Sequence, residues 1–311
     1  MTEKTHGLPR GSSVLASSDD AEYSHLRNEV NMGCKFWSPF AANKADSELG
    51  FIAHSPSTQT LTLTLSSLPT VDDLLEFLSV DALDDKVFVD LSPDYFAHNS
   101  TASVPQIYHT FDQAFDVHGK SALYALEQII AEPPQSDSPV AAFLPKQLRP
   151  LVEWFYPSNP PIAHVDIVGH GLGGVVGLLV SLALSKSSPE MPITSTLFSL
   201  PRMGNPAFAA WVDDKMDSKF QVYRVVSYAD TIPHVPAEHL GVAHPKKGEV
   251  WVGADPRTAY ACNSAGSSTA ICSASVAFSR TSLVDHNGPF GGIWIQDGTE
   301  CGIGFNVAKT L

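Results

Sequence analysis

Hydrophobic positions along the chain fall into short β-like runs and longer helical ones. Residues 1–20 are polar, rich in serine and charge, and are typical of a loosely attached arm. The apolar runs 49–54 and 61–65 flank the turn-like sequence Ser-Pro-Ser-Thr-Gln, so they predict a β-hairpin. Three further β-rich runs predict strands at 163–168, 196–200 and 221–227.

Helical periodicity separates these strands. The segment 108–130 repeats apolar residues at helical spacing and ends before two prolines, and 207–216 is a second helix candidate. The run 172–184 is apolar on almost every side, which predicts a buried helix. A short amphipathic helix at 70–78 is either a lid or a packed surface helix, and its apolar residues are Val71, Leu74, Leu75 and Leu78. The alternation of strands and helices favours an α/β fold with a central, mostly parallel sheet flanked by helices.

Composition narrows the class of protein. With 311 residues, 43% of them hydrophobic, we expect a single domain at 31–311 behind a flexible N-terminal arm at 1–30. Lys and Arg total 19 against 33 for Asp and Glu, and the net charge of -14 argues against nucleic acid as a partner. No apolar run approaches the roughly 20 residues of a membrane span, so we expect no transmembrane segment. The first ten residues lack the apolar stretch of a secretory leader, and we expect any leader to be absent or already removed.

The four cysteines allow two disulfides. The most economical pairing is a short loop between Cys262 and Cys272 with a long tie between Cys34 and Cys301. Four buried thiols in a reducing compartment are the alternative.

A glycine-rich turn joins the predicted strand 163–168 to the predicted helix 172–184. It reads Gly-His-Gly-Leu-Gly-Gly at 169–174, where hydrolases of this architecture carry the nucleophile elbow G-x-S-x-G. Gly169 and Gly173 fill the two positions where a Cβ would collide with the neighbouring strand and helix. The central residue is Gly171, which relieves the backbone strain of this turn but supplies no hydroxyl for an acyl-enzyme. A phosphate-binding loop is disfavoured, because the lysine-containing and dinucleotide-binding glycine patterns are both missing.

Two later residues suit the other roles of a catalytic triad. Asp230 follows a predicted strand, where a carboxylate can orient an imidazole, and His286 lies in a late loop, where a histidine can act as general base. Ser181 is a poor substitute for the missing nucleophile, because it lies about 15 Å along the helix from the elbow. We expect neither a cofactor nor a metal.

At these segments the chain resembles the fungal class 3 lipases, the Rhizomucor-type secreted triacylglycerol lipases. The turn at 168–174 is similar to the family's V-T-G-H-S-L-G-G, and 201–208 is similar to P-R-V-G-N-P-A-F. The segment 228–236 is similar to N-D-P-V-P-R-L-P, and 240–245 and 249–252 are similar to L-G-Y-x-H and E-x-W-I. The resemblance runs from about residue 34 to residue 301.

The resemblance implies an α/β-hydrolase fold, a lipid or acyl-ester ligand, a lipid-water interface and an extracellular setting. It implies Asp230 as the triad acid, His286 as the base, and the segment 70–78 as the lid. It also implies the bridges Cys34–Cys301 and Cys262–Cys272, and oxyanion donors at Ser67 or Leu68 and at Leu172.

Several positions depart from the family pattern besides Gly171. The family's R-G-[ST] reads Ser66-Ser67-Leu68, its H-x-G-F reads His109-Thr110-Phe111-Asp112, and its lid tryptophan is Leu74. Because these positions have changed together, the sequence favours a natural pseudo-lipase over a laboratory-inactivated lipase. A secreted interaction protein without enzymatic activity is the third hypothesis.

Overall fold

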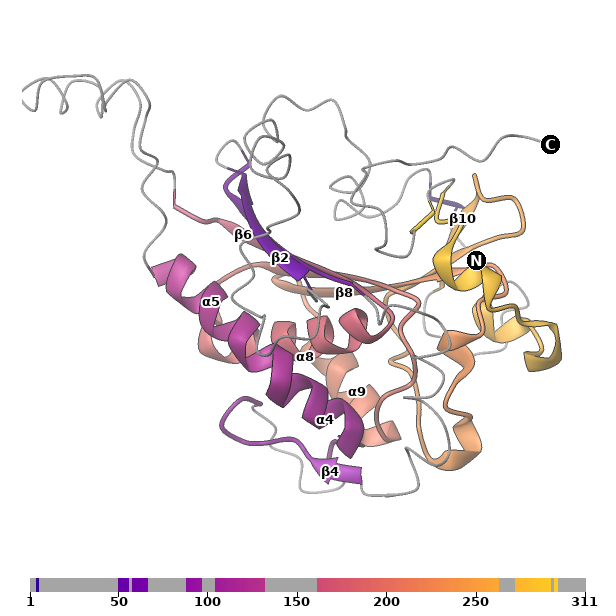
Figure 1. Ribbon diagram of the computed structural model, residues 1–311, viewed down its shortest axis with the longest axis horizontal. Helices are drawn as coiled ribbons and strands as arrows, with labels where there is room; N and C mark the ends of the chain where they lie inside the picture. Colours follow the sequence, from indigo (N-terminus) through magenta and orange to yellow (C-terminus); the bar gives the residue numbers. More distant parts are fainter. Residues whose placement is uncertain are drawn as a thin grey trace, which may run out of the picture.

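We analysed a computed structural model of the chain, drawn in Figure 1. The structure describes residues 4–5, 50–55, 58–66, 88–96, 104–131, 161–262, 272–291 and 294–295. Four sequence-based predictions fall outside these residues: the lid at 70–78, the oxyanion candidates Ser67 and Leu68, the bridge Cys34–Cys301, and most of the arm at 1–30.

A central sheet of eight strands organises the fold. Its strand order is β1-β10-β9-β8-β7-β6-β3-β2, and the five inner strands from β9 to β3 run parallel to one another. Strands β2 and β10 pair antiparallel with this inner set, and β1 pairs antiparallel with β10. The strands are β1 (Lys4–Thr5), β2 (Gly50–Ser55), β3 (Thr60–Leu65), β6 (His164–His170), β7 (Ile193–Phe198), β8 (Phe220–Ser227), β9 (Glu249–Val252) and β10 (Ala259–Cys262).

The described α-helices lie on one side of the sheet in Figure 1. They are α4 (His109–Ala114), α5 (Lys120–Ala131), α8 (Leu172–Ser187) and α9 (Pro206–Lys215), with the π-helical segment η3 (Phe115–Gly119) between α4 and α5. A small sheet pairs β4 (Phe88–Asp90) with β5 (Gln106–Tyr108). Five short 3-10 turns are described: η4 (Ile232–His234), η5 (Glu238–Leu240), η6 (Ser273–Ser275), η7 (Phe278–Arg280) and η8 (Val284–Asn287).

Helix α8 lies at the centre of the core. Its first thirteen residues, Leu172 to Leu184, are all buried, and the helix packs against β6 and β7 on one side and α5 on the other. Fully burying a leucine or valine side chain contributes about 1.5–3 kcal/mol, so this helix is a main source of stability. Helix α9 begins at the sequence Asn-Pro because Asn205 accepts a hydrogen bond from the Phe208 N–H at 2.8 Å and Pro206 fits the first turn.

The predicted elements agree with the structure apart from some of their ends. The hairpin is confirmed as β2 and β3, and the mostly parallel sheet is confirmed. The helix predicted at 108–130 is confirmed as an unbroken helical stretch that begins at His109 and ends at Ala131. It widens into the π-helical η3, where Gly119 allows the Phe115 ring to pack against the backbone. The strand predicted to stop at residue 169 continues through His170. Among the described residues, no helix is long and apolar enough to cross a membrane.

Candidate active site

The turn between β6 and α8 places Gly171 in a conformation that side chains avoid. Gly171 has φ 53° and ψ -119°, and it is the N-cap residue of α8. Its N–H donates to the Phe198 carbonyl at 3.0 Å, and its own carbonyl accepts from Gly174 and Val175 at 3.0 and 3.2 Å. The turn is therefore fixed at both ends by backbone hydrogen bonds, and residue 171 is held rigidly between a buried strand and a buried helix.

The flanking glycines allow the strand and the helix to approach this closely. A Cβ on Gly169 would lie 2.5 Å from the Gly173 carbonyl oxygen, and a Cβ on Gly173 would lie 2.3 Å from the Ser66 carbonyl oxygen. Both obstacles are backbone atoms, which cannot rotate away. The collision predicted for a Cβ at these two positions is confirmed.

Asp230 and His286 meet in the interior although 56 residues separate them. Asp230 follows the end of β8 by three residues, and His286 lies in η8. The Nδ1 atom of His286 lies 3.4 Å from Oδ1 and 3.5 Å from Oδ2 of Asp230, and the two residues are 1% and 0% exposed. Oδ1 of Asp230 also accepts the Ile232 N–H at 2.9 Å, which orients the carboxylate.

This contact settles which nitrogen of His286 is free for chemistry. A carboxylate accepts hydrogen bonds, so Nδ1 carries the proton that faces Asp230 and Nε2 keeps its lone pair in the neutral ring. Nε2 is buried and has no hydrogen-bond partner among the described residues. A buried imidazole nitrogen with a free lone pair is the group that a general base needs.

His170 connects the elbow to this histidine. The rings of His170 and His286 lie 4.4 Å apart between centroids, and Nε2 of His170 lies 2.9 Å from the His286 carbonyl oxygen. Ser199 donates to the same carbonyl at 3.1 Å. Burial, and then the neighbouring His286, lower the pKa of His170 to about 3, so its ring is neutral and donates through Nε2–H.

The other predicted site residues divide into three groups. Leu172 begins α8 next to Gly171 and is buried, so its backbone N–H belongs to the helix N-terminus. Ser181 donates to the Leu178 carbonyl at 2.8 Å inside α8, which keeps it out of the site. Cys262 and Cys272 form a disulfide with a Cα–Cα distance of 6.1 Å, as the sequence predicted.

Sequence reasoning missed His170 and Ser199 as the partners of the His286 backbone. His170 lies inside the elbow motif, yet the motif gives no reason for a histidine at that position. Ser199 carries one structural signal, a φ of 55°, which is uncommon for a residue with a side chain. Neither contact could be derived from the sequence, because each joins residues 87 to 116 positions apart.

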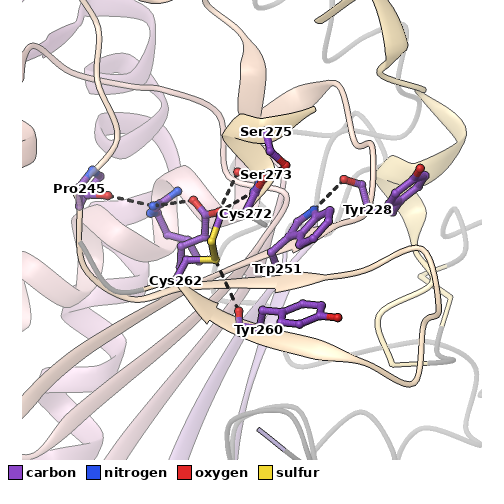
Figure 2. Close-up of a disulfide and its surroundings, with 10 residues drawn as sticks. Tyr228, Pro245, Trp251, Tyr260, Cys262, Cys272, Ser273 and Ser275 are labelled. Carbon is purple, nitrogen blue, oxygen red and sulfur yellow. Dashed lines mark hydrogen bonds and ion pairs between the residues drawn. A yellow bond between two sulfur atoms is a disulfide. The ribbon is translucent and has the colours of Figure 1, made fainter. Parts of the chain in front are cut away.

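One group of described residues has the composition of a metal site. It consists of Glu249, Cys262 and Cys272. The two sulfur atoms are bonded to each other, as Figure 2 shows, so neither is a thiolate that could bind a metal.

The fold and the elbow define the class of protein. A mostly parallel sheet whose central strand turns sharply through a strained residue into a buried helix is the arrangement of the α/β hydrolases. Solved structures agree: a triacylglyceride lipase of Rhizomucor miehei superposes with a TM-score of 0.54 at 21% identity, covering 81% of this chain and 78% of that one. A triacylglycerol lipase of Penicillium expansum gives a TM-score of 0.56 at 17% identity, covering 80% of each chain.

Sequence comparison finds similarity to one family of lipases over part of the chain. Residues 100–240 match the model of the family described as Lipase (class 3). A secreted mono- and diacylglycerol lipase of Malassezia globosa is 41% identical over 90 residues, and a lipase of Rhizopus niveus is 33% identical over 129 residues. These alignments cover 29% and 40% of this chain, and the chain spans only 29% and 31% of the length of these two relatives. Over these residues the chain is similar to the class 3 lipases.

Proposed function

We propose that the chain is a pseudo-lipase, a lipase-fold protein that binds acyl esters but does not hydrolyse them at the rate of a lipase. The observation that carries this proposal is the pairing of Gly171, at the strained position of the elbow, with a buried Nε2 on His286 that has no hydrogen-bond partner in the described part of the chain. In the family mechanism a serine hydroxyl would occupy position 171 and give its proton to that nitrogen. Glycine leaves the acid and the base with no nucleophile between them.

The proposed roles follow from the geometry of the dyad. His286 would accept the nucleophile's proton at Nε2, and Asp230 would stabilise the imidazolium through Nδ1–H. The Leu172 N–H, at the positive end of α8, would stabilise the oxyanion together with a donor from 67–68. Without a hydroxyl at 171 no acyl-enzyme forms, and loss of the nucleophile lowers kcat by about 10⁶ in a well-measured serine hydrolase.

We further propose an extracellular setting and an acyl-ester ligand. Support for the setting comes from the Cys262–Cys272 disulfide and from relatives described as secreted lipases. Support for the ligand comes from the names of the same relatives, which describe mono- and diacylglycerol lipases.

Ester hydrolysis tests the central claim directly. The native chain should hydrolyse p-nitrophenyl butyrate and tributyrin at rates within about tenfold of those of its His286→Ala variant. Without the nucleophile, only substrate binding and polarisation of the ester remain to promote the reaction. Turnover by the native chain at the rate of an active class 3 lipase would refute the proposal.

The Gly171→Ser variant separates the pseudo-lipase from a second candidate, an active lipase that this chain represents in inactivated form. The specific observation that favours this candidate is the intact contact between Asp230 and His286. If only the nucleophile was lost, serine at 171 restores turnover. If the other positions have also lost function, the variant stays inert.

A third candidate, a secreted interaction protein, predicts no lipid binding at all. Displacement of a fluorescent fatty-acid probe by acyl esters should be measurable for the pseudo-lipase, and tryptophan-quenching controls report whether the protein is folded. Failure of the folded chain to bind the probe would favour the interaction protein.

A further inference from the structure

The disulfide Cys262–Cys272 holds a turn that is connected to the buried charges of the sheet. Ser273 follows Cys272 directly, and its N–H and hydroxyl both donate to Oε1 of Glu249, at 3.0 and 2.9 Å. Oε2 of Glu249 accepts from Nη2 of Arg224 at 3.2 Å, and the Arg224 side chain is 3% exposed. Figure 2 shows Ser273 beside the disulfide. The backbone at Ser273 is therefore fixed by the disulfide on one side and by the partly buried Glu249 carboxylate on the other.

His234 joins this turn to the proposed triad acid. Nε2 of His234 lies 3.2 Å from the Ser273 carbonyl oxygen, and Nδ1 lies 2.9 Å from the Asp230 carbonyl oxygen. Both partners are carbonyl oxygens, which only accept hydrogen bonds, so each bond uses a proton on the ring nitrogen that faces it. The His234 backbone is held as well, because its carbonyl accepts from the guanidinium of Arg202.

The contact between Asp230 and His286 is sensitive to the position of this loop. Its 3.4 and 3.5 Å distances lie at the outer limit of a hydrogen bond, so a displacement of a few tenths of an ångström would break it. Asp230 lies three residues beyond the end of β8, and its N–H donates to the Ser227 carbonyl at 2.8 Å. Backbone contacts also hold the residues before Asp230. The Trp251 Nε1–H donates to the Tyr228 carbonyl at 2.8 Å, and the Ser282 N–H donates to the Ala229 carbonyl at 2.7 Å. His234 adds the contact with the Asp230 carbonyl itself.

We propose that His234 is a positioning residue that holds Asp230 in register with His286 by tying its backbone to the disulfide-held turn at Ser273. The inference rests on the proposed roles of Asp230 and His286. It adds a residue that touches neither substrate nor the reacting atoms, and it gives the disulfide a part in orienting the triad acid.

The kinetic test uses the Gly171→Ser variant as the background. His234→Leu removes both donors, and we expect kcat to fall about 10- to 100-fold with KM unchanged, because misplacement of about 1 Å has effects of that size. His234→Gln keeps an N–H donor and should retain more of kcat than the leucine variant. His239→Ala is the matched control, since His239 is exposed and lies only five residues away.

The disulfide supplies a second arm with a sharper readout. Replacing both Cys262 and Cys272 by serine should lower kcat to the level of His234→Leu. The combined variant should lose no more than either change alone, because both break one chain of contacts. All variants are assayed at a temperature at which circular dichroism shows each of them to be folded. Independent, multiplicative losses from the two changes would overturn the proposal.

Hydrogen exchange separates failure of this inference from failure of the proposed function. In the native Gly171 chain, His234→Leu should raise the rate of amide hydrogen exchange at 230–232 at least tenfold and leave the rate in α8 unchanged. The control variant His239→Ala should leave the exchange rate at 230–232 unchanged. If Gly171→Ser is inert, the proposed reactivation fails and exchange alone decides the role of His234. Unchanged exchange at 230–232 in the leucine variant would overturn the inference whether or not the serine variant is active.

Discussion

The variants Gly171→Ser and Gly171→Ala separate two opposing contributions to stability at the elbow. Both add a Cβ at φ 53° and ψ -119°, a conformation that costs a residue other than glycine about 1–3 kcal/mol. Only serine adds a hydroxyl. In the proposed geometry this hydroxyl donates to Nε2 of His286, which no other described residue contacts by a hydrogen bond, and removes a desolvation penalty of about 1–3 kcal/mol. Alanine should therefore lower the free energy of unfolding by about 1–3 kcal/mol, whereas serine should leave it within about 1 kcal/mol of the native value.

Urea unfolding at pH 7, followed by tryptophan fluorescence, measures both variants without any need for activity. The control is the same pair of changes in a His286→Ala background, where the hydroxyl has no imidazole to meet and the two variants should be equally stable. If serine is no more stable than alanine in the native background, residue 171 does not face Nε2 of His286. The proposed assignment of the acid and base to this elbow would then be wrong.

Three further measurements test the site and its surroundings. His170→Gln should make the loss of unfolding free energy between pH 7 and pH 5 smaller by about 2 kcal/mol, as urea titrations at the two pH values would show. In the folded protein the pKa of His170 is lowered from 6.5 to about 3. The stability that depends on a neutral His170 is therefore complete above pH 6.5 and is lost as the pH falls below it, at about 1.4 kcal/mol per pH unit. An unchanged pH dependence would contradict a neutral, buried ring. Gly173→Ala should destabilise the fold by at least about 1–3 kcal/mol in thermal melts, because the added Cβ meets a backbone oxygen at 2.3 Å. The control Gly177→Ala should cost less, because its Cβ meets only side chains, at 3.2 Å or more. Glu249→Gln should cost about 3–5 kcal/mol in urea unfolding, since it leaves the Arg224 guanidinium buried without its carboxylate, and a cost below about 1 kcal/mol would mean that water reaches the guanidinium.

The sequence was sufficient for the parts of the fold that depend on local pattern. Alternation of apolar residues located the hairpin, and the long apolar run located α8, because burial on all sides leaves no polar face. The elbow could be placed because its glycines answer a local steric demand between consecutive elements. Asp230 and His286 were found through motifs, and the structure brings their side chains together.

Contacts that depend on tertiary packing could not be predicted in the same way. The π-helical turn at 115–119 has no periodic signature of its own, since a single wider turn shifts the apolar face only slightly. The bonds from His170 and Ser199 to the His286 carbonyl, and those from His234 to Asp230 and Ser273, involve backbone acceptors. A backbone acceptor leaves no mark on the amino-acid sequence, so the supports of the dyad are visible only in three dimensions.

The energetics of the elbow explain how a dyad persists beside a glycine. Replacing a serine by glycine at position 171 relieves a backbone strain of about 1–3 kcal/mol and leaves Nε2 of His286 unpartnered at a similar cost. Because the two terms oppose each other, the exchange is nearly neutral for folding. The contacts that hold the dyad come from Ile232, His170, Ser199 and His234, and none of them involves a side chain at 171. An intact acid and base are therefore what the fold of a pseudo-lipase should retain, and their presence does not by itself argue for turnover.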